Sequence, residues 1–159
     1  MNVRVRTKLR YPCDARTLFD LIASDDGILS FVGFGPIPGT RETRRETGDH
    51  HEVGAIGRTT NADGTTHRET VLEVDPPRRY RLRIDEFSSV FRFIVRYAEE
   101  TYAIEGVEAP VELHRTFVFH PTTPLVLPLT IPLAYGAFRV ALHRSNLRMR
   151  ALIAERAGW

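Results

Sequence analysis

The chain has 159 residues, which is the length of one domain and enough for a sizeable core. Hydrophobic residues make up 42% and charged residues 26%, so the composition excludes a disordered chain and a membrane-embedded one. The formal net charge is only +2, with acids interleaved among the arginines, and we expect no nucleic-acid partner. Cys13 is the single cysteine, so no internal disulfide can form, and the basic start lacks the apolar run of a signal peptide. Both features predict a cytoplasmic protein.

The first segment predicts a half-buried strand followed by two short helices. Odd positions from 3 to 9 are Val, Val, Thr and Leu, whereas even positions from 4 to 10 are basic. Pro12 ends this strand, and Asp14 favours a helix start. Apolar residues then recur at helical spacing between positions 15 and 22, and again between 28 and 32. Glycines and Pro36 end the second helix.

The middle of the chain predicts a meander of six sequential strands. Extended runs are separated by turn signals such as Asp63-Gly64 and Asp75-Pro76-Pro77. The predicted strands lie near 40–47, 53–61, 65–74, 79–85, 90–104 and 111–120.

The segment 125–142 is almost wholly apolar and imitates a membrane span. Pro128, Pro132 and Arg139 lie inside it, and these residues argue against an uninterrupted spanning helix and against stable membrane insertion. An amphipathic last helix is predicted from about 133 to 157. Its apolar stripe consists of Phe138, Leu142, Ser145, Met149 and Leu152. Such a helix needs an apolar surface, and the concave face of a twisted sheet provides one.

The order of strand, two short helices, six-strand meander and long helix resembles the START-like or SRPBCC superfamily, with polyketide cyclase/dehydrase-type members closest. Tyr11-Pro12-Cys13-Asp14-Ala15 and Gly54-Ala55-Ile56-Gly57-Arg58 carry part of the resemblance. The strongest match is the strand, Asp-Pro-Pro turn and strand of residues 69–80. The resemblance implies a single α+β helix-grip domain over residues 1–159: a curved seven-stranded antiparallel sheet around a long C-terminal helix, with an internal cavity. The segment 124–132 would then be a roof or entrance loop.

For function, the resemblance implies a domain that binds a polyketide, polycyclic or lipid-like molecule, with or without catalysing its cyclisation or dehydration. The alternatives are a non-catalytic carrier or ligand-responsive partner module, and a vestigial fold whose cavity is filled by side chains. The superfamily contains both enzymes and carriers, so the fold alone does not choose between them. The sequence is compatible with a monomer or a homodimer.

Strand alternation places two arginines on apolar faces. Arg115 shares a face with Val111, Leu113, Phe117 and Phe119, and Arg68 shares one with Thr70, Leu72 and Val74. If these faces line the cavity, each guanidinium needs a partner, because an unpaired buried charge is costly. Glu99 and Glu100 are the internal candidates, and an anionic ligand group is the alternative. A structural ion pair, or an arginine that reaches water from a strand end, is the non-functional interpretation.

The functional hypothesis assigns roles to these residues and to nearby hydroxyls. An inward arginine would hold a carboxylate or stabilise an enolate oxygen, and Tyr80, Tyr97 or Thr70 would orient carbonyls or relay protons. Some aromatase/cyclases of the superfamily use an interior arginine in this way, and Arg68 is the closest positional candidate. The expected catalytic set is Arg68, Arg115, Tyr80, Tyr97 and Glu99. The expected ligand contacts are Phe31, Phe34, Thr70, Phe91, Phe93, Phe117, Phe138 and Leu142, with Phe34 as a gate.

Metal and nucleotide signatures are missing from the sequence. It contains no Cys-x-x-Cys, no His-x-x-x-His and no phosphate-binding glycine loop. We therefore expect no metal site and no dissociable redox cofactor. Cys13 has no histidine near it in sequence and is interpreted as an inert helix-start residue.

Overall fold

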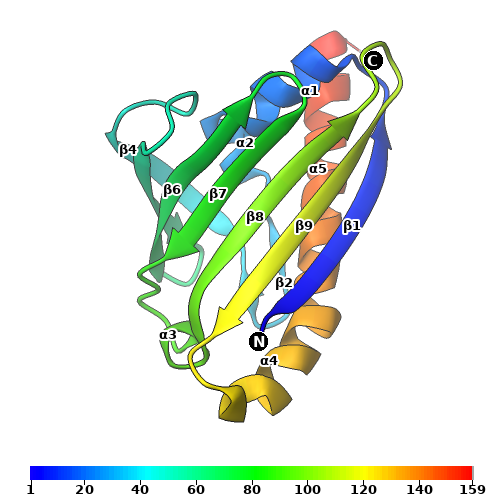
Figure 1. Ribbon diagram of the computed structural model, residues 1–159. Helices are drawn as coiled ribbons and strands as arrows, with labels where there is room; N and C mark the ends of the chain where they lie inside the picture. The colour runs from blue at the N-terminus through cyan, green and yellow to red at the C-terminus, as the bar shows by residue number, and fades with distance from the viewer. Residues whose placement is uncertain (159) are drawn as a thin grey trace.

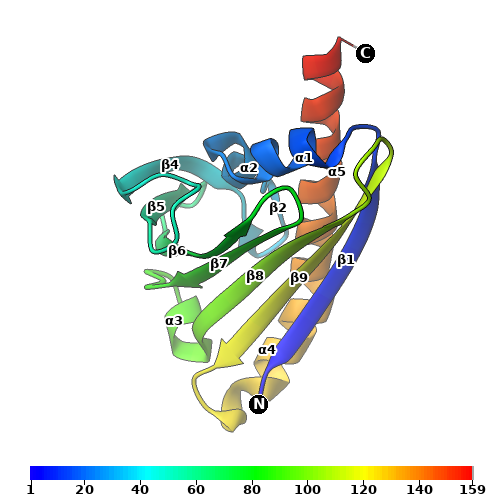
Figure 2. The same ribbon diagram turned by 45° about the horizontal axis from the view of Figure 1, so that its top comes forward.

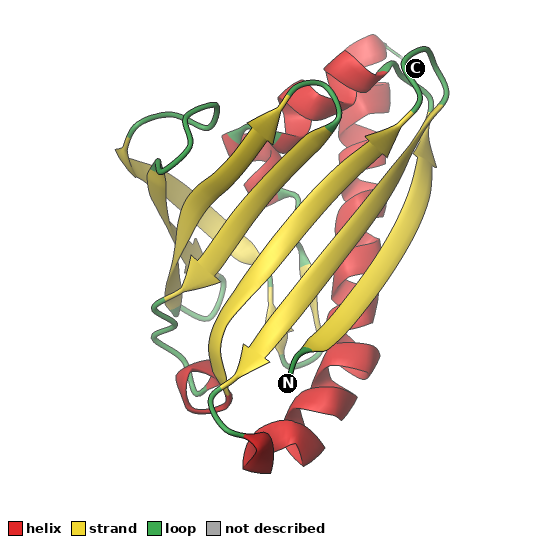
Figure 3. Cartoon of the chain, in the orientation of Figure 1, coloured by secondary structure: helices red, strands yellow, loops and turns green. Residues whose placement is uncertain are grey.

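The computed structural model describes residues 1–158 and contains one large antiparallel sheet (Figures 1 and 3). The seven strands follow the order β1-β9-β8-β7-β6-β5-β4. They are β1 (Val3–Tyr11), β4 (Thr40–Thr47), β5 (Ile56–Asn61), β6 (Thr66–Asp75), β7 (Arg79–Asp85), β8 (Val95–Glu105) and β9 (Val111–Pro121). Consecutive strands of the predicted meander are neighbours, and β1 closes the far edge against β9. This is the helix-grip topology that the sequence predicted.

Two short helices and a small hairpin connect β1 to the meander. The helices are α1 (Ala15–Ile22) and α2 (Asp25–Leu29), and the hairpin consists of β2 (Gly33–Phe34) and β3 (Ile37–Pro38). The Asp14 carboxylate caps α1 by accepting a hydrogen bond from the Thr17 backbone N–H at 2.8 Å. Ser24 caps α2 in the same way. These caps fix the path by which the chain leaves the sheet and crosses to its concave side.

The C-terminal helix lies on the concave side of the curved sheet (Figure 2). It is longer than predicted, because the chain stays helical from residue 124 to 157 through η1 (Pro124–Val126), α4 (Leu127–Leu133), η2 (Ala134–Phe138) and α5 (Arg139–Ala157). The expected proline break and entrance loop at 124–132 are therefore wrong. Pro128 lies in the first turn of α4, where its missing N–H costs nothing, and a π-helical turn, η2, follows Pro132.

This helical stretch is long and apolar enough to meet a length and composition criterion for a membrane span. In the fold it contributes core residues: Phe138, Leu142 and Met149 are buried against the sheet and α1. Other apolar residues of the stretch, among them Leu125, Leu129 and Ile131, are exposed, so burial accounts for only part of its apolar character.

Two strands begin later than the sequence predicted. Residues 91–94, expected at the start of a strand, form the short helix α3 (Phe91–Ile94), and β8 begins at Val95. In this helix Phe91 and Ile94, three residues apart, face the interior, while Arg92 and Phe93 are exposed. A short apolar run fits both the two-residue period of a strand and the 3.6-residue period of a helix, which explains why a strand was expected here. The strand expected from residue 53 begins at Ile56, after a turn.

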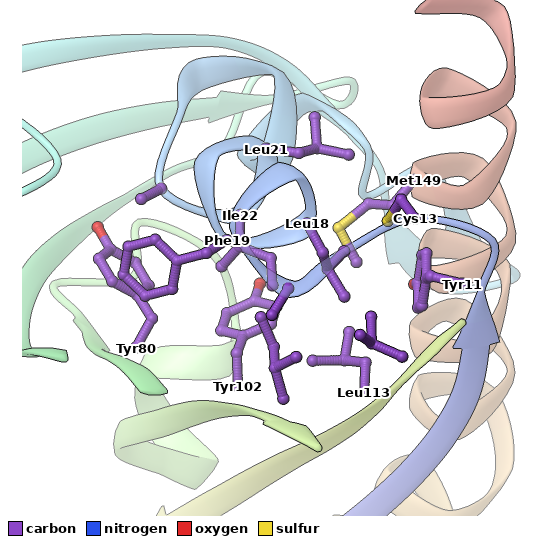
Figure 4. Packing of buried hydrophobic residues seen from close by; sticks show 14 of the residues in the cluster. Tyr11, Cys13, Leu18, Phe19, Leu21, Ile22, Tyr80, Tyr102, Leu113 and Met149 are labelled. Carbon is purple, nitrogen blue, oxygen red and sulfur yellow. The ribbon is translucent and has the colours of Figure 1, made fainter. Parts of the chain in front are cut away.

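The hydrophobic core has two parts. One surrounds α1 and is shown in Figure 4, where Leu18 and Phe19 pack among Tyr80, Tyr102 and Leu113 of the sheet and Met149 of α5. The other lies nearer α4 and η2 and includes Val5, Phe117, Phe119, Phe138 and Leu142. Residues of the second part, together with Leu82 and Tyr102 of the first, line an open space.

Candidate functional site

A cavity of about 280 Å³ lies between the sheet, α2, α3 and the C-terminal helix. Its wall is mainly aromatic and aliphatic, as in most small-molecule sites. Six phenylalanines line it: Phe31, Phe87, Phe91, Phe117, Phe119 and Phe138. Of these, Phe138 lies closest to the sheet aromatics, with ring centroids 4.5 Å from Phe117 and 4.8 Å from Phe119.

Half of the expected ligand contacts lie at this cavity. Phe31, Phe91, Phe117 and Phe138 line it, although Phe91 does so from a helix and not from the expected strand.

The other four expected contacts lie elsewhere. Leu142 is fully buried in the core, and Thr70 lies on the outer face of β6. Phe93 is 62% exposed on the solvent side of α3. Phe34 is 42% exposed in the β2–β3 hairpin, close to Arg144 at 5.9 Å, so the proposed gate is a surface residue in this structure.

Arg115 points inward from β9 and lines the cavity, as alternation predicted. It is 2% exposed and is held by three hydrogen bonds. Its Nε donates to Glu100 Oε1 at 2.5 Å, and its Nη1 donates to Ser145 Oγ at 2.9 Å and Asn146 Oδ1 at 3.1 Å. Burial lowers the pKa of the guanidinium, but Glu100 together with Tyr102 and Tyr11 outweighs this effect, and the pKa is raised overall. The arginine therefore stays charged and ties β9 and β8 to α5.

Tyr102 is the residue beside Arg115 that the sequence analysis missed. It lines the cavity from β8, two residues beyond Glu100, and its ring centroid lies 4.8 Å from the Arg115 Cζ. Burial raises the pKa of its hydroxyl well above the usual value, and the Arg115 charge only partly opposes this. Because the hydroxyl stays protonated, it can donate a hydrogen bond. With Arg115 it forms an arrangement able to hold a carbonyl oxygen and stabilise negative charge on it.

Arg68 does not point inward, and this expectation is wrong. Its Nε and Nη2 donate to the two Asp85 oxygens at 2.9 and 3.1 Å, and its Nη1 lies 2.8 Å from Glu86, on the outer face of the sheet. Strict alternation fails because β6 contains a bulge: Val71 pairs with Leu82, but Glu73 pairs with Arg81. The extra residue brings both Val71 and Val74 to the core side and leaves Arg68 outside.

The remaining catalytic candidates are not at the cavity. Glu99 and Tyr97 face outward from β8, where Glu99 contacts Arg81 and His120, and the Tyr97 ring stacks on His120 at 4.0 Å. Their neighbour Glu100 is the inward acid, which answers the question of facing that the sequence left open. Tyr80 points inward but is packed in the core under α1, and its hydroxyl donates to the His50 carbonyl at 2.8 Å.

A second polar group at the cavity was also missed. His67 and Glu69 of β6 line it, with the His67 Nε2 3.0 Å from Glu69 Oε1. The signal was present in the sequence, because positions 67, 69 and 71 share a face and Val71 is apolar. The expectation that Arg68 faces inward placed His67 and Glu69 on the outer face, so this pair was not recognised.

Glu105, Glu112 and His114 could hold a metal ion, since their donor atoms lie within 4.8 Å of one another. The group lies at the partly exposed β8–β9 end of the sheet. His114 Nε2 is 3.1 Å from Glu105 and 2.9 Å from Glu112, so the imidazole already pairs with both carboxylates.

Cys13 lies under α1, away from the cavity. Burial, reinforced by the neighbouring Asp14 charge, raises the pKa of its thiol from 9.0 to about 11. The thiolate fraction at pH 8 is thereby reduced about 100-fold, and it increases only as the pH approaches 11. We expect the native protein to react with iodoacetamide at pH 8 at least tenfold more slowly than the urea-unfolded chain. Mass-spectrometric labelling rates measure this, and equal rates would contradict it.

The architecture and the cavity define a START-like helix-grip protein with a mainly apolar site between the sheet and the helices. The chain belongs to the family described as polyketide cyclase / dehydrase and lipid transport, whose model matches residues 2–154. None of the curated proteins matches the sequence significantly.

Solved structures of similar fold cover almost the whole chain. Ara h 8.0201 superposes with a TM-score of 0.74 at 13% identity, over 98% of this chain and 99% of that one. A major latex-like protein from Panax ginseng gives 0.69 at 10% identity, over 94% and 96%. Norcoclaurine synthase from Thalictrum flavum, in complex with dopamine and hydroxybenzaldehyde, gives 0.64 at 15% identity, over 98% and 88%. At these identities the likeness shows the fold alone.

Proposed function

We propose that this chain encloses a hydrophobic small molecule, of polyketide, polycyclic or lipid-like type, in its internal cavity, and that Arg115 and Tyr102 hold one of its oxygen atoms. The observation that carries the proposal is the cavity of about 280 Å³ lined by six phenylalanines. Empty apolar space of this size forfeits packing energy, which a bound apolar molecule would restore.

The chemistry of the wall supports an oxygen-bearing ligand. Three hydrogen bonds use Nε and Nη1 of Arg115, and Nη2, which has no hydrogen-bond partner within residues 1–158, can donate to a ligand oxygen. Tyr102 supplies a second donor from the same strand as Glu100. Two donors that converge on an apolar space fix the orientation of a ligand while its body is held by the aromatic wall. The same pair would stabilise the enolate of a cyclisation or dehydration, so a carrier and a cyclase share this binding step.

A matched pair of isoleucine substitutions tests the cavity as the binding site. Ile84 lines the cavity, whereas Ile131 is exposed on α4. We expect 2-methoxynaphthalene to bind the wild-type protein, to bind Ile84→Trp at least tenfold more weakly because the indole fills the space, and to bind Ile131→Trp within about twofold of wild type. Isothermal titration calorimetry measures the affinities, and thermal melting verifies that both variants are folded. Wild-type protein that binds no probe, or equal binding to Ile84→Trp, would remove the proposal.

A further inference from the structure

One end of the cavity, near the β5–β6 turn, is polar, and its side chains take no part in the proposed contact at Arg115. Asn61, Asp63, Thr65, His67 and Glu69 all line the cavity there. Glu69 is only 4% exposed, so its carboxylate has little access to water. A buried carboxylate needs hydrogen-bond donors for both of its oxygens, because a missing donor leaves the desolvation cost uncompensated.

Only one of the two Glu69 oxygens has donors. Oε1 accepts from the Thr59 hydroxyl at 3.2 Å and lies 3.0 Å from His67 Nε2. Within residues 1–158, Oε2 is buried and has no hydrogen-bond partner. Buried side-chain atoms without a partner are rare in folded proteins, so the Glu69 carboxylate has capacity for a further donor.

Arg45 is the cation that faces this acid from the neighbouring strands, and it does not supply the donor. Arg45 pairs with Gly57 across β4 and β5, and Gly57 pairs with Glu69 across β5 and β6. The guanidinium lies over Gly57, with Nη2 1.6 Å from where a Cβ would be. In the described part of the chain, Arg45 and Glu69 form no ion pair, and Arg45 Nε and Nη1 are also buried without partners.

His67 is the histidine that contacts Glu69 at this end. Its Nε2 faces a carboxylate, which can only accept, so Nε2 donates to Glu69 Oε1. Its Nδ1 lies 3.5 Å from the Asn61 Nδ2, the limit of a hydrogen bond. Glu69 therefore offers an acceptor at the cavity, whereas Arg115 and Tyr102 offer donors at their own part of the wall.

We propose that Glu69, oriented by His67 and Thr59, is a ligand-binding residue that accepts a hydrogen bond from a hydroxyl or amine group of the enclosed molecule. The ligand then has an apolar body, an oxygen acceptor at Arg115 and a hydrogen-bond donor at Glu69. This inference depends on the proposed function, because it names a polar group of the molecule that the cavity holds.

Two probes of the same apolar body test the proposal. 2-Naphthol carries a hydroxyl donor, and 2-methoxynaphthalene carries the same oxygen without the proton. We expect the wild-type protein to bind 2-naphthol about tenfold more tightly, as a hydrogen bond to a charged group implies. In Glu69→Leu this ratio should fall to about one, while 2-methoxynaphthalene still binds. Glu73→Leu is the matched control, because Glu73 lies on the same strand but pairs with Arg79 and Arg81 outside the cavity.

The ratio of the two affinities, measured by calorimetry on each variant, is insensitive to a general loss of folded protein. Equal affinity of wild-type protein for the two probes, or an unchanged ratio in Glu69→Leu, would overturn the role of Glu69 while leaving the cavity proposal intact. If neither probe binds the wild-type protein, both proposals fail. A ratio lost in Glu69→Leu and also in Glu73→Leu would overturn the assignment, because the effect would not depend on the cavity face.

Discussion

Replacing Glu100 with leucine is expected to lower the free energy of unfolding by about 3–5 kcal/mol. Glu100 is the counter-charge of Arg115, which is almost completely buried and whose other hydrogen bonds within residues 1–158 go to neutral groups of α5, Ser145 and Asn146. In Glu100→Leu the guanidinium keeps its hydrogen bonds to α5 but loses the carboxylate, and an uncompensated charge remains inside the protein. Urea unfolding followed by circular dichroism measures the change.

Glu99→Leu is the control for this experiment. It changes the same residue type at the next position of β8, but Glu99 pairs with Arg81 and His120 on the outer face, and its loss should cost less than about 1 kcal/mol. The double variant Glu100→Leu/Arg115→Met should recover most of the stability, because it removes both charges. A cost for Glu100→Leu no larger than that for Glu99→Leu would show that Arg115 is not dependent on its carboxylate.

The second large effect is expected for Phe138→Ala, about 3–5 kcal/mol of unfolding free energy. Phe138 belongs to the π-helical turn η2, and its ring contacts Phe31, Phe117 and Phe119. Truncation removes the contact of the helix with the sheet on one side of the cavity and enlarges a space that is already present, so neighbouring residues cannot close the gap. Phe34→Ala, at an exposed position of the β2–β3 hairpin, should cost less than about 1 kcal/mol.

Thermal and urea unfolding of both phenylalanine variants measure this difference. If Phe138→Ala were no more costly than Phe34→Ala, the helix would not be held to the sheet by this aromatic group, and the wall of the cavity would have to be assigned to other residues.

The fold could be predicted from the sequence because its elements are marked by independent local signals. Regular alternation in β1 and β9, turn residues between strands, and capping by Asp14 each depend on a few adjacent residues. The same alternation correctly placed Arg115 and Phe117 on the inner face. Errors arose where one residue changes the phase of a pattern: the bulge in β6 reversed the facing of Arg68 and Thr70, and it concealed Glu69.

The polar part of the site was less accessible to sequence analysis, because it depends on contacts between distant positions. Arg115 meets Ser145 and Asn146 across about 30 residues of chain, and Glu69 meets Thr59 across a hairpin. No local pattern shows that Glu100 and not Glu99 is the inward acid, because apolar residues occur at both the odd and the even positions of the segment from 90 to 104. That choice depends on the irregular pairing of β8 with β9 between Val95 and Tyr97.

The π-helical turn η2 also determines how the two halves of the C-terminal helix are related. A π turn contains one residue more than an α-helical turn, which offsets the following residues by about 100° around the helix axis. A helical wheel drawn continuously through residues 127–157 would thus misplace the side chains of α4 relative to those of α5. Leu133 reaches the cavity while Leu129 and Ile131 are exposed, and this distribution belongs to α4 alone. Insertions or deletions near residue 136 would therefore rotate the side chains of α4 relative to those of α5 and change which of them face the cavity.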